Sequence, residues 1–312
     1  MQHKRYLISV TLLLAMVLGG CASADNSDVQ EGPLSVTVSI VPQAYFVERI
    51  GGEHVAVNVM VEPGASPATY EPKPEQLAAL SESVAYFSIG VPFENVWLAR
   101  IADANPEMRV VDTAADVERL PMSDHTHHDE EGHEDEHADE EYEEDEHAEG
   151  VLDPHIWLSP ELVKVQAQSI HDALVELDPE YEADYAANLD AFLTDIDALQ
   201  ADIRETLAGV ENRAFMVFHP SWGYFADEFD LIQIPIEVGG QEPSAQELAA
   251  LIDEAKEENI KVVFAQPEFS TSAAETIAQE IDGEVLLVSP LARDWLANLR
   301  DVAQTFADAL AE

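Results

Sequence analysis

The sequence predicts an α/β protein with two groups of short strands separated by a long helical stretch. In both groups, β-branched and apolar runs with strand periodicity alternate with helical patterns. This alternation is typical of parallel sheets flanked by helices, with ligand-binding loops at the carboxyl ends of the strands. The chain has 312 residues, 46% of them hydrophobic, which is enough for two lobes with sizeable cores.

The first lobe is expected to span residues 33–158. Its first strand is expected at Leu34 to Val41, where polar and β-branched residues alternate. The further elements predicted are strands at 55–61, 86–89 and 108–112, a Pro/Gly-rich turn at 63–74, and a helix at about 75–83.

Residues 159–210 are predicted to be helical. Pro160 suits a first helical turn, and Asp178-Pro179 marks a break. The segment after the break, 179–207, could extend ~45 Å at about 1.5 Å per residue. Such a helix is long enough to join two lobes.

The second lobe is expected to span residues 211–312. Compact apolar runs alternate with amphipathic stretches there. The predicted strands are 214–218, 232–236, 262–265 and 285–288, and the predicted helices include 245–258 and 272–280.

The N-terminus has the pattern of an export signal. Lys4 and Arg5 precede an apolar run, residues 7–18, that is too short to span a bilayer comfortably. The following Leu18-Gly19-Gly20-Cys21 resembles a bacterial-type lipobox, and Cys21 is the only cysteine. We therefore expect a signal peptide at 1–20, lipidation of Cys21, a tether at 21–32, and a location on the outer face of the cytoplasmic membrane. The alternatives are an ordinary signal peptide with an incidental cysteine, or a transmembrane anchor.

Charge limits the possible partners. Sixty-three acidic residues against 14 basic ones give a net charge of −49, which repels nucleic acids and favours cations. Residues 121–150 contain 15 acidic residues and no Lys or Arg. The rest of the chain still has 48 acidic residues against 14 basic ones, so the acidity is not confined to this stretch. We expect no nucleic-acid partner.

Residues 121–150 are predicted to be a disordered loop inserted in the first lobe, because they have almost no apolar side chains. Histidines among carboxylates can bind transition metals weakly, which suggests a collecting arm or sensor. The alternative is a solubilising insert without a specific ligand. The histidines of this loop are His125, His127, His128, His133, His137 and His147.

Two histidines outside this loop are candidate metal ligands. His219 directly follows the predicted strand at 214–218, and His155 lies in Asp153-Pro154-His155-Ile156-Trp157-Leu158. Neutral imidazole is the commonest side-chain ligand of zinc. Either histidine could instead cap a helix or form a hydrogen bond in the core.

Four motifs in order resemble the zinc/manganese solute-binding family of ABC transporters. Besides the Asp-Pro-His motif they are Thr69-Tyr70-Glu71-Pro72, Phe218-His219 with Gly223-Tyr224-Phe225, and Glu242-Pro243-Ser244-Ala245. The resemblance covers nearly everything from residue 33 onward. It implies two α/β lobes joined by one long helix, a metal held in the cleft between them, and His155 and His219 as ligands from opposite lobes.

The chain departs from that family pattern at two positions. It has Ala68 where the family usually has histidine, and Ser289-Pro290 where the family usually has aspartate. An alanine cannot bind metal and a neutral hydroxyl is a poor ligand, so the site must be rebuilt from other side chains, completed by water, or weaker than usual. The candidate replacements are Glu237, Gln266, Glu268 and Glu71. Each acid could also be an ordinary surface or capping carboxylate.

These features predict a binding protein, not an enzyme. It would capture zinc, or manganese, and deliver it as a monomer to the permease and ATPase of an ABC importer. A surface metal buffer or adhesin-like lipoprotein that works through the histidine-rich loop is the alternative. A zinc hydrolase is the weaker third class, because the chain has no His-Glu-x-x-His pair, nucleophile elbow or phosphate loop.

Overall fold

The computed structural model describes residues 32–123 and 151–311. The predicted signal peptide, Cys21 and the histidine-rich stretch from His125 to His147 lie outside these residues. None of the described helices combines the length and the apolar character needed to cross a membrane.

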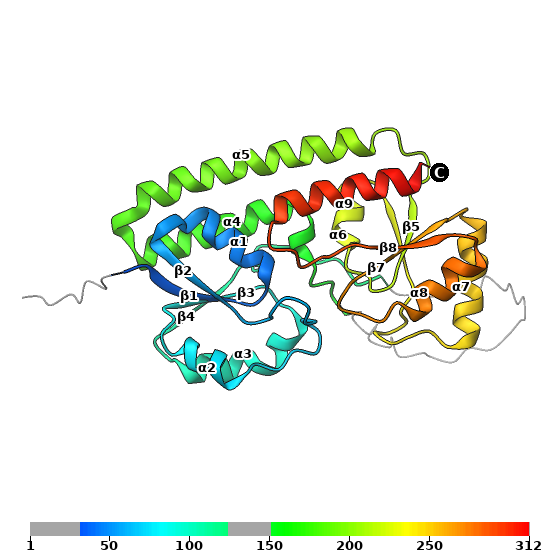
Figure 1. Ribbon diagram of the computed structural model, residues 1–312. Coiled ribbons are helices and arrows are strands. Elements are labelled where there is room, and N and C mark those ends of the chain that lie inside the picture. The colour runs from blue at the N-terminus through cyan, green and yellow to red at the C-terminus, as the bar shows by residue number, and fades with distance from the viewer. Residues whose placement is uncertain (1–31, 124–150, 312) are drawn as a thin grey trace, which may run out of the picture. The chain divides into compact units, whose positions relative to one another are not determined.

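The first lobe contains a parallel sheet of four strands in the order β2-β1-β3-β4. Figure 1 shows α1 on one face of this sheet and α2 and α3 on the other. The strands are β1 (Leu34–Val38), β2 (Val55–Val59), β3 (Ala85–Ser88) and β4 (Arg109–Asp112), and the helices are α1 (Val41–Gly51), α2 (Pro74–Leu80) and α3 (Pro92–Ala104).

The prediction of a first strand reaching Val41 is wrong. The strand ends at Val38, and α1 begins at Val41 with Pro42 in its first turn. Proline has no N–H to donate and its φ suits a helix start, so it favours this transition. Ile40 and Val41 are nevertheless buried, which is why the apolar pattern continues past the end of the strand.

The two lobes are joined by helices. The 18-residue α4 (Pro160–Leu177) is followed by a 3₁₀ turn at Pro179–Tyr181 and by α5 (Glu182–Leu207), with 26 residues. The Ser159 hydroxyl caps α4 by accepting a hydrogen bond from the Leu162 N–H. The break predicted at Asp178-Pro179 is confirmed, although the long helix starts three residues later than predicted. It packs against α1, α4 and the C-terminal α9 (Trp295–Leu310) (Figure 1).

The second lobe repeats the arrangement of the first, with a parallel sheet in the order β6-β5-β7-β8. In both sheets the strand that comes first in the chain lies between the second and the third. This confirms the predicted fold class of two α/β lobes with a long helix between them. The elements are β5 (Ala214–Val217), α6 (Gly223–Glu228), β6 (Ile232–Pro235), α7 (Ala245–Glu257), β7 (Val262–Ala265), α8 (Ser272–Glu280) and β8 (Glu284–Leu287).

Three helices of the second lobe end in the same turn. Asp230, Asn259 and Asp282 have φ angles of 56°, 53° and 54°, the left-handed conformation that Asn and Asp tolerate better than most residues. In each turn the next N–H donates back to a carbonyl five residues earlier, at 2.8–2.9 Å. These turns lead each helix directly into the next strand, so the strands run parallel and their carboxyl ends share one edge.

One apolar core joins the two lobes. Trp295 of α9 packs edge-on against Phe46 of α1, with ring centroids 5.2 Å apart. Phe306, three turns further along α9, packs against Phe264 of β7 at 4.4 Å. The helix therefore contacts both lobes and limits their relative movement. This apolar cluster runs through both lobes and does not show where one lobe ends and the other begins. The lobe boundaries at 158 and 211 therefore stay a prediction.

Glu94 in the first turn of α3 ties together the loops that follow β1 and β3. Its carboxylate accepts hydrogen bonds from the Ser39 hydroxyl and from the N–H groups of Ile89 and Gly90, the latter at 3.1 and 2.7 Å. The residue is 4% exposed. Burial raises the pKa of Glu94, and these hydrogen bonds offset part of that rise.

We predict that Glu94 makes folding stability depend on pH just above its ordinary pKa of 4.5. The native state binds the Glu94 proton more tightly than the unfolded state does. Protonation of Glu94 therefore stabilises the folded protein, and this contribution is complete below the unfolded pKa. It is lost as pH rises through the folded pKa, with a slope of at most about 1.4 kcal/mol per pH unit. Chemical denaturation of the protein and of Glu94→Gln across this range measures the difference between them. A difference that does not change with pH would contradict the prediction.

Candidate metal centre

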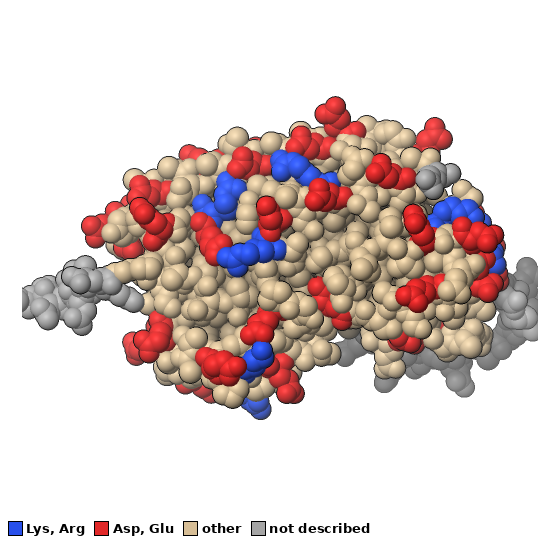
Figure 2. All heavy atoms as spheres, viewed as in Figure 1, with Lys and Arg blue, Asp and Glu red and all other residues tan. Residues whose placement is uncertain are grey.

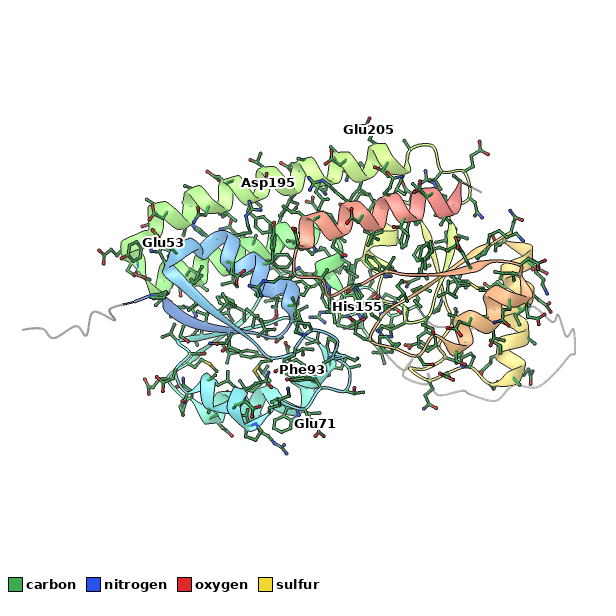
Figure 3. The ribbon with its side chains drawn as sticks, in the orientation of Figure 1. Glu53, Glu71, Phe93, His155, Asp195 and Glu205 are labelled. Atoms are coloured by element: carbon green, nitrogen blue, oxygen red, sulfur yellow. The ribbon has the colours of Figure 1, made fainter. Side chains whose placement is uncertain are left out.

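Loops at the carboxyl ends of both sheets enclose a cavity of about 270 Å³. His155 and His219 both line it, as do the candidate acids Glu237 and Glu268. Figure 3 shows His155 between the two lobes. The other walls are mostly apolar and include Pro67, Ala68, Val91, Pro92, Met122, Pro154, Trp157, Pro220, Phe269, Pro290 and Leu291.

His155 is fixed by the aspartate two residues before it. Asp153 Oδ1 accepts a hydrogen bond from the His155 backbone N–H at 2.8 Å and lies 2.7 Å from His155 Nδ1. Both residues are buried, and burial lowers the pKa of His155. A neutral imidazole keeps a lone pair available for a metal ion. Trp157 lies beside the ring at a centroid distance of 5.1 Å.

His219 is fixed through both its ring and its backbone. Glu237 Oε1 lies 2.7 Å from His219 Nδ1. The Gln266 side chain accepts a hydrogen bond from the His219 N–H at 3.2 Å and donates one to the His219 carbonyl at 2.5 Å. Phe269 stacks on the imidazole at 4.6 Å. The ring has little freedom to turn.

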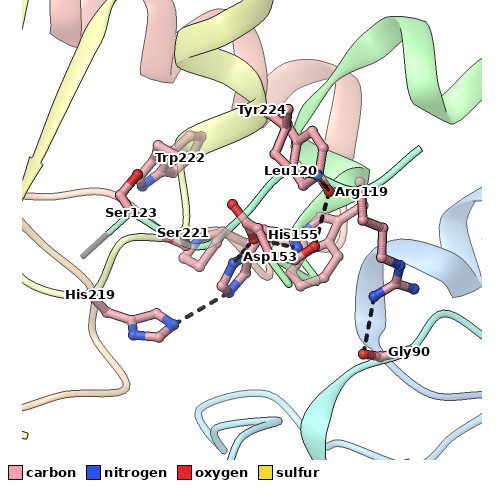
Figure 4. A network of polar contacts seen from close by, with 12 residues as sticks. Gly90, Arg119, Leu120, Ser123, Asp153, His155, His219, Ser221, Trp222 and Tyr224 are labelled. Carbon is pink, nitrogen blue, oxygen red and sulfur yellow. Dashed lines mark hydrogen bonds and ion pairs between the residues drawn. The ribbon is translucent and has the colours of Figure 1, made fainter. Parts of the chain in front are cut away.

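The two imidazoles face each other through their Nε2 atoms, 3.3 Å apart (Figure 4). An ionised carboxylate can only accept hydrogen bonds, so the Nδ1 atom of each ring carries the proton. When both rings are neutral, both Nε2 atoms are acceptors and repel each other. A cation bound between them would remove this conflict.

The spacing of the two Nε2 atoms fits tetrahedral zinc. Zinc binds imidazole nitrogen at about 2.0–2.1 Å, so two such ligands at a tetrahedral angle are about 3.3–3.4 Å apart. The observed separation of 3.3 Å falls in this range. The carboxylate behind each ring is also the usual partner of a metal-bound histidine.

The four candidate replacement donors lie in different environments. Glu237 contacts the Nδ1 atom of His219, and the Gln266 side chain forms hydrogen bonds with the His219 backbone. Glu71 is exposed, lies away from His155 (Figure 3) and does not line the cavity. Glu268 lines the cavity, where burial raises its pKa and where its Oε2 atom is buried without a hydrogen-bond partner. Among the described residues no three metal-binding side chains converge in this conformation.

The two departures from the family pattern have different consequences. Ala68 lines the cavity and leaves apolar space where a side-chain donor could project. The Ser289 hydroxyl accepts a hydrogen bond from the Leu291 N–H at 3.2 Å, so it binds the backbone of its own loop. Sequence reasoning did not assign roles to Asp153 and Phe269. The position of Asp153 two residues before a histidine is typical of a side chain that binds the nearby backbone.

Comparison with known proteins places this chain in a family of metal-uptake proteins. Residues 36–309 match the family model described as ZnuA, the periplasmic component A of the zinc-uptake complex. The high-affinity zinc uptake protein ZnuA of Bacillus subtilis is 29% identical over 92% of this chain and 87% of its own length. The manganese-binding lipoprotein MntA of Halalkalibacterium halodurans is 25% identical over 97% of each chain. A crystal structure of a ZnuA is 48% identical, with a TM-score of 0.79 over 89% of this chain and 99% of that one.

We predict that Glu237→Gln weakens zinc binding about 10- to 100-fold by loosening the orientation of His219. Glu71→Gln removes the same charge from an exposed position, so its zinc affinity should match that of the unchanged protein. Competition with a chromophoric chelator measures both affinities. Equal losses in the two variants would instead indicate a general effect of charge.

Proposed function

The chain belongs to the ZnuA family of periplasmic zinc-uptake components, and from this premise we propose that it captures one zinc ion for an ABC importer. The ion would pass to the permease of that importer, driven by its ATPase. Manganese is the alternative cargo, because the family includes a relative named as manganese-binding.

His155 and His219 are the proposed ligands. The observation that supports this most strongly is the approach of their Nε2 atoms to 3.3 Å, with a carboxylate on the opposite nitrogen of each ring. Two imidazole nitrogens favour zinc over manganese, which prefers oxygen donors. The remaining coordination positions would be filled by water or by a further side chain.

Capture and release follow from where the two rings are attached. His219 follows a strand of the second sheet, and His155 lies in the segment that leads into α4. Bringing them together closes the site, and moving them apart would remove one ligand. No covalent bond changes in this cycle, so we propose a binding role without catalysis.

Surface charge supports the proposed capture of cations. Figure 2 shows acidic side chains spread widely over the visible face, with Lys and Arg fewer and scattered among them. The summed negative potential would raise the local cation concentration and the rate of metal association. This effect weakens as salt concentration rises.

Location and anchoring remain proposals from the sequence. We propose an extracytoplasmic protein held at the outer face of the cytoplasmic membrane by a lipid on Cys21. The name of the MntA relative, a lipoprotein, supports this. The histidine-rich stretch at 121–150 would act as a collecting arm, and the protein would work as a monomer.

The direct test of the site is the double variant His155→Ala, His219→Ala. We expect the unchanged protein to retain one zinc ion against a strong competing chelator, and the double variant to retain none, because alanine has no donor atom. Metal content after dialysis measures this. The histidine-rich stretch is present in both proteins, so weak binding there cancels in the comparison. A double variant that keeps its tight zinc would contradict the assignment.

Restoring a donor at Ala68 gives a second prediction. Ala68 lines the cavity, so the imidazole of Ala68→His can reach the metal and fill an open coordination position. We expect zinc affinity to rise at least about tenfold, with a smaller change for manganese. Ala68→Leu, which adds similar bulk without a donor, is the matched control. A gain in both variants would indicate packing and not coordination.

A further inference from the structure

We propose that Glu268 is the third protein ligand of the bound metal and replaces the donor that Ala68 cannot supply. This inference rests on the proposed function. It gives the site two imidazoles and one carboxylate, with one position left for water.

The geometry that supports this is a buried carboxylate oxygen without a partner. Glu268 Oε2 is shielded from water and has no hydrogen-bond partner. Leaving an ionised carboxylate oxygen in that state is costly, so the carboxyl group either keeps a proton or pairs with a cation. None of the described residues that line the cavity is Lys or Arg, so no side-chain cation of the wall takes that role.

Glu268 also has the right position. It lies in the loop after β7, two residues beyond Gln266, which holds the His219 backbone. Its neighbour Phe269 stacks on the His219 ring. The loop that positions His219 therefore carries Glu268 into the same cavity.

The other acids around the site have roles that keep them from the metal. Asp153 and Glu237 each contact the Nδ1 atom of an imidazole, on the side of the ring away from the facing Nε2 atoms. Moving either one to the metal would release the ring it orients. Glu268 is held only by its own backbone N–H, so it can turn its free oxygen toward an arriving ion at little cost.

This movement is required, because no three donors of the described residues converge in this conformation. Glutamate has three side-chain torsions, and no hydrogen bond from Glu268 to a neighbouring side chain would have to break. The metal would therefore be bound first by the two preset imidazoles and then closed over by Glu268. The resulting His-His-Glu set suits zinc and accepts manganese better than three imidazoles would.

The test compares zinc and manganese affinity in the full chain, in Glu268→Gln and in Glu268→His. Glu268→Gln should weaken zinc binding more than about 100-fold, beyond the 10- to 100-fold loss typical of residues that only orient a ligand. Glu268→His should recover zinc binding and weaken manganese binding, because imidazole replaces an oxygen donor. Glu71→Gln is the matched control for loss of one negative charge, and its affinities should not change.

X-ray absorption of the zinc-loaded chain gives a readout that does not depend on affinity. We expect two imidazoles and a carboxylate oxygen at about 2.0–2.2 Å, and loss of an oxygen scatterer or a longer bond in Glu268→Gln. If Glu268→Gln keeps zinc within threefold while the double histidine variant loses it, the ligand role of Glu268 is overturned and the proposed function stands. If the unchanged protein binds no zinc tightly, the proposed function itself fails.

Discussion

Two hydrogen bonds between carboxylates and imidazoles determine the chemistry of this site. Asp153 and Glu237 each bind the Nδ1 atom of one histidine at 2.7 Å, which sets the tautomer and points both Nε2 atoms at one place. The two Nε2 atoms lie 3.3 Å apart, and in neutral rings both carry a lone pair there. The protein has placed two lone pairs close together, and a cation stabilises that arrangement.

The fold keeps this arrangement rigid. Trp157 donates a hydrogen bond from its indole to the Pro290 carbonyl, and Trp295 donates one to the Trp157 carbonyl, both at 2.7 Å. These contacts join the segment that carries His155 to the second lobe and to α9. The mostly apolar walls of the cavity lower the local polarity, which strengthens electrostatic interactions inside it. Helix α9 contacts both lobes as well, so the segments around the two histidines are tied to one core.

Most of the architecture could be predicted from the sequence, because strand and helix periodicity are local properties. The eight strands found among the described residues, and the break at Asp178-Pro179, were predicted close to their observed positions. The first strand was extended too far because Ile40 and Val41 are buried in either conformation. Helices α1, α3, α6 and α9 were not predicted individually. Few residues in the sequence mark where these helices begin. Which of their faces is buried depends on the sheets and helices that they pack against.

The sequence alone indicated an acidic α/β protein, and the resemblance of its four motifs to a known family implied that His155 and His219 are metal ligands. It could do so because strand and helix periodicity, net charge and the order of motifs are all properties of the chain itself. It could not rank Glu237, Gln266, Glu268 and Glu71, since four polar side chains near strand ends look alike without their partners. Only the tertiary structure separated them, by showing which oxygen is already hydrogen-bonded, which is exposed, and which is buried in the cavity without a partner.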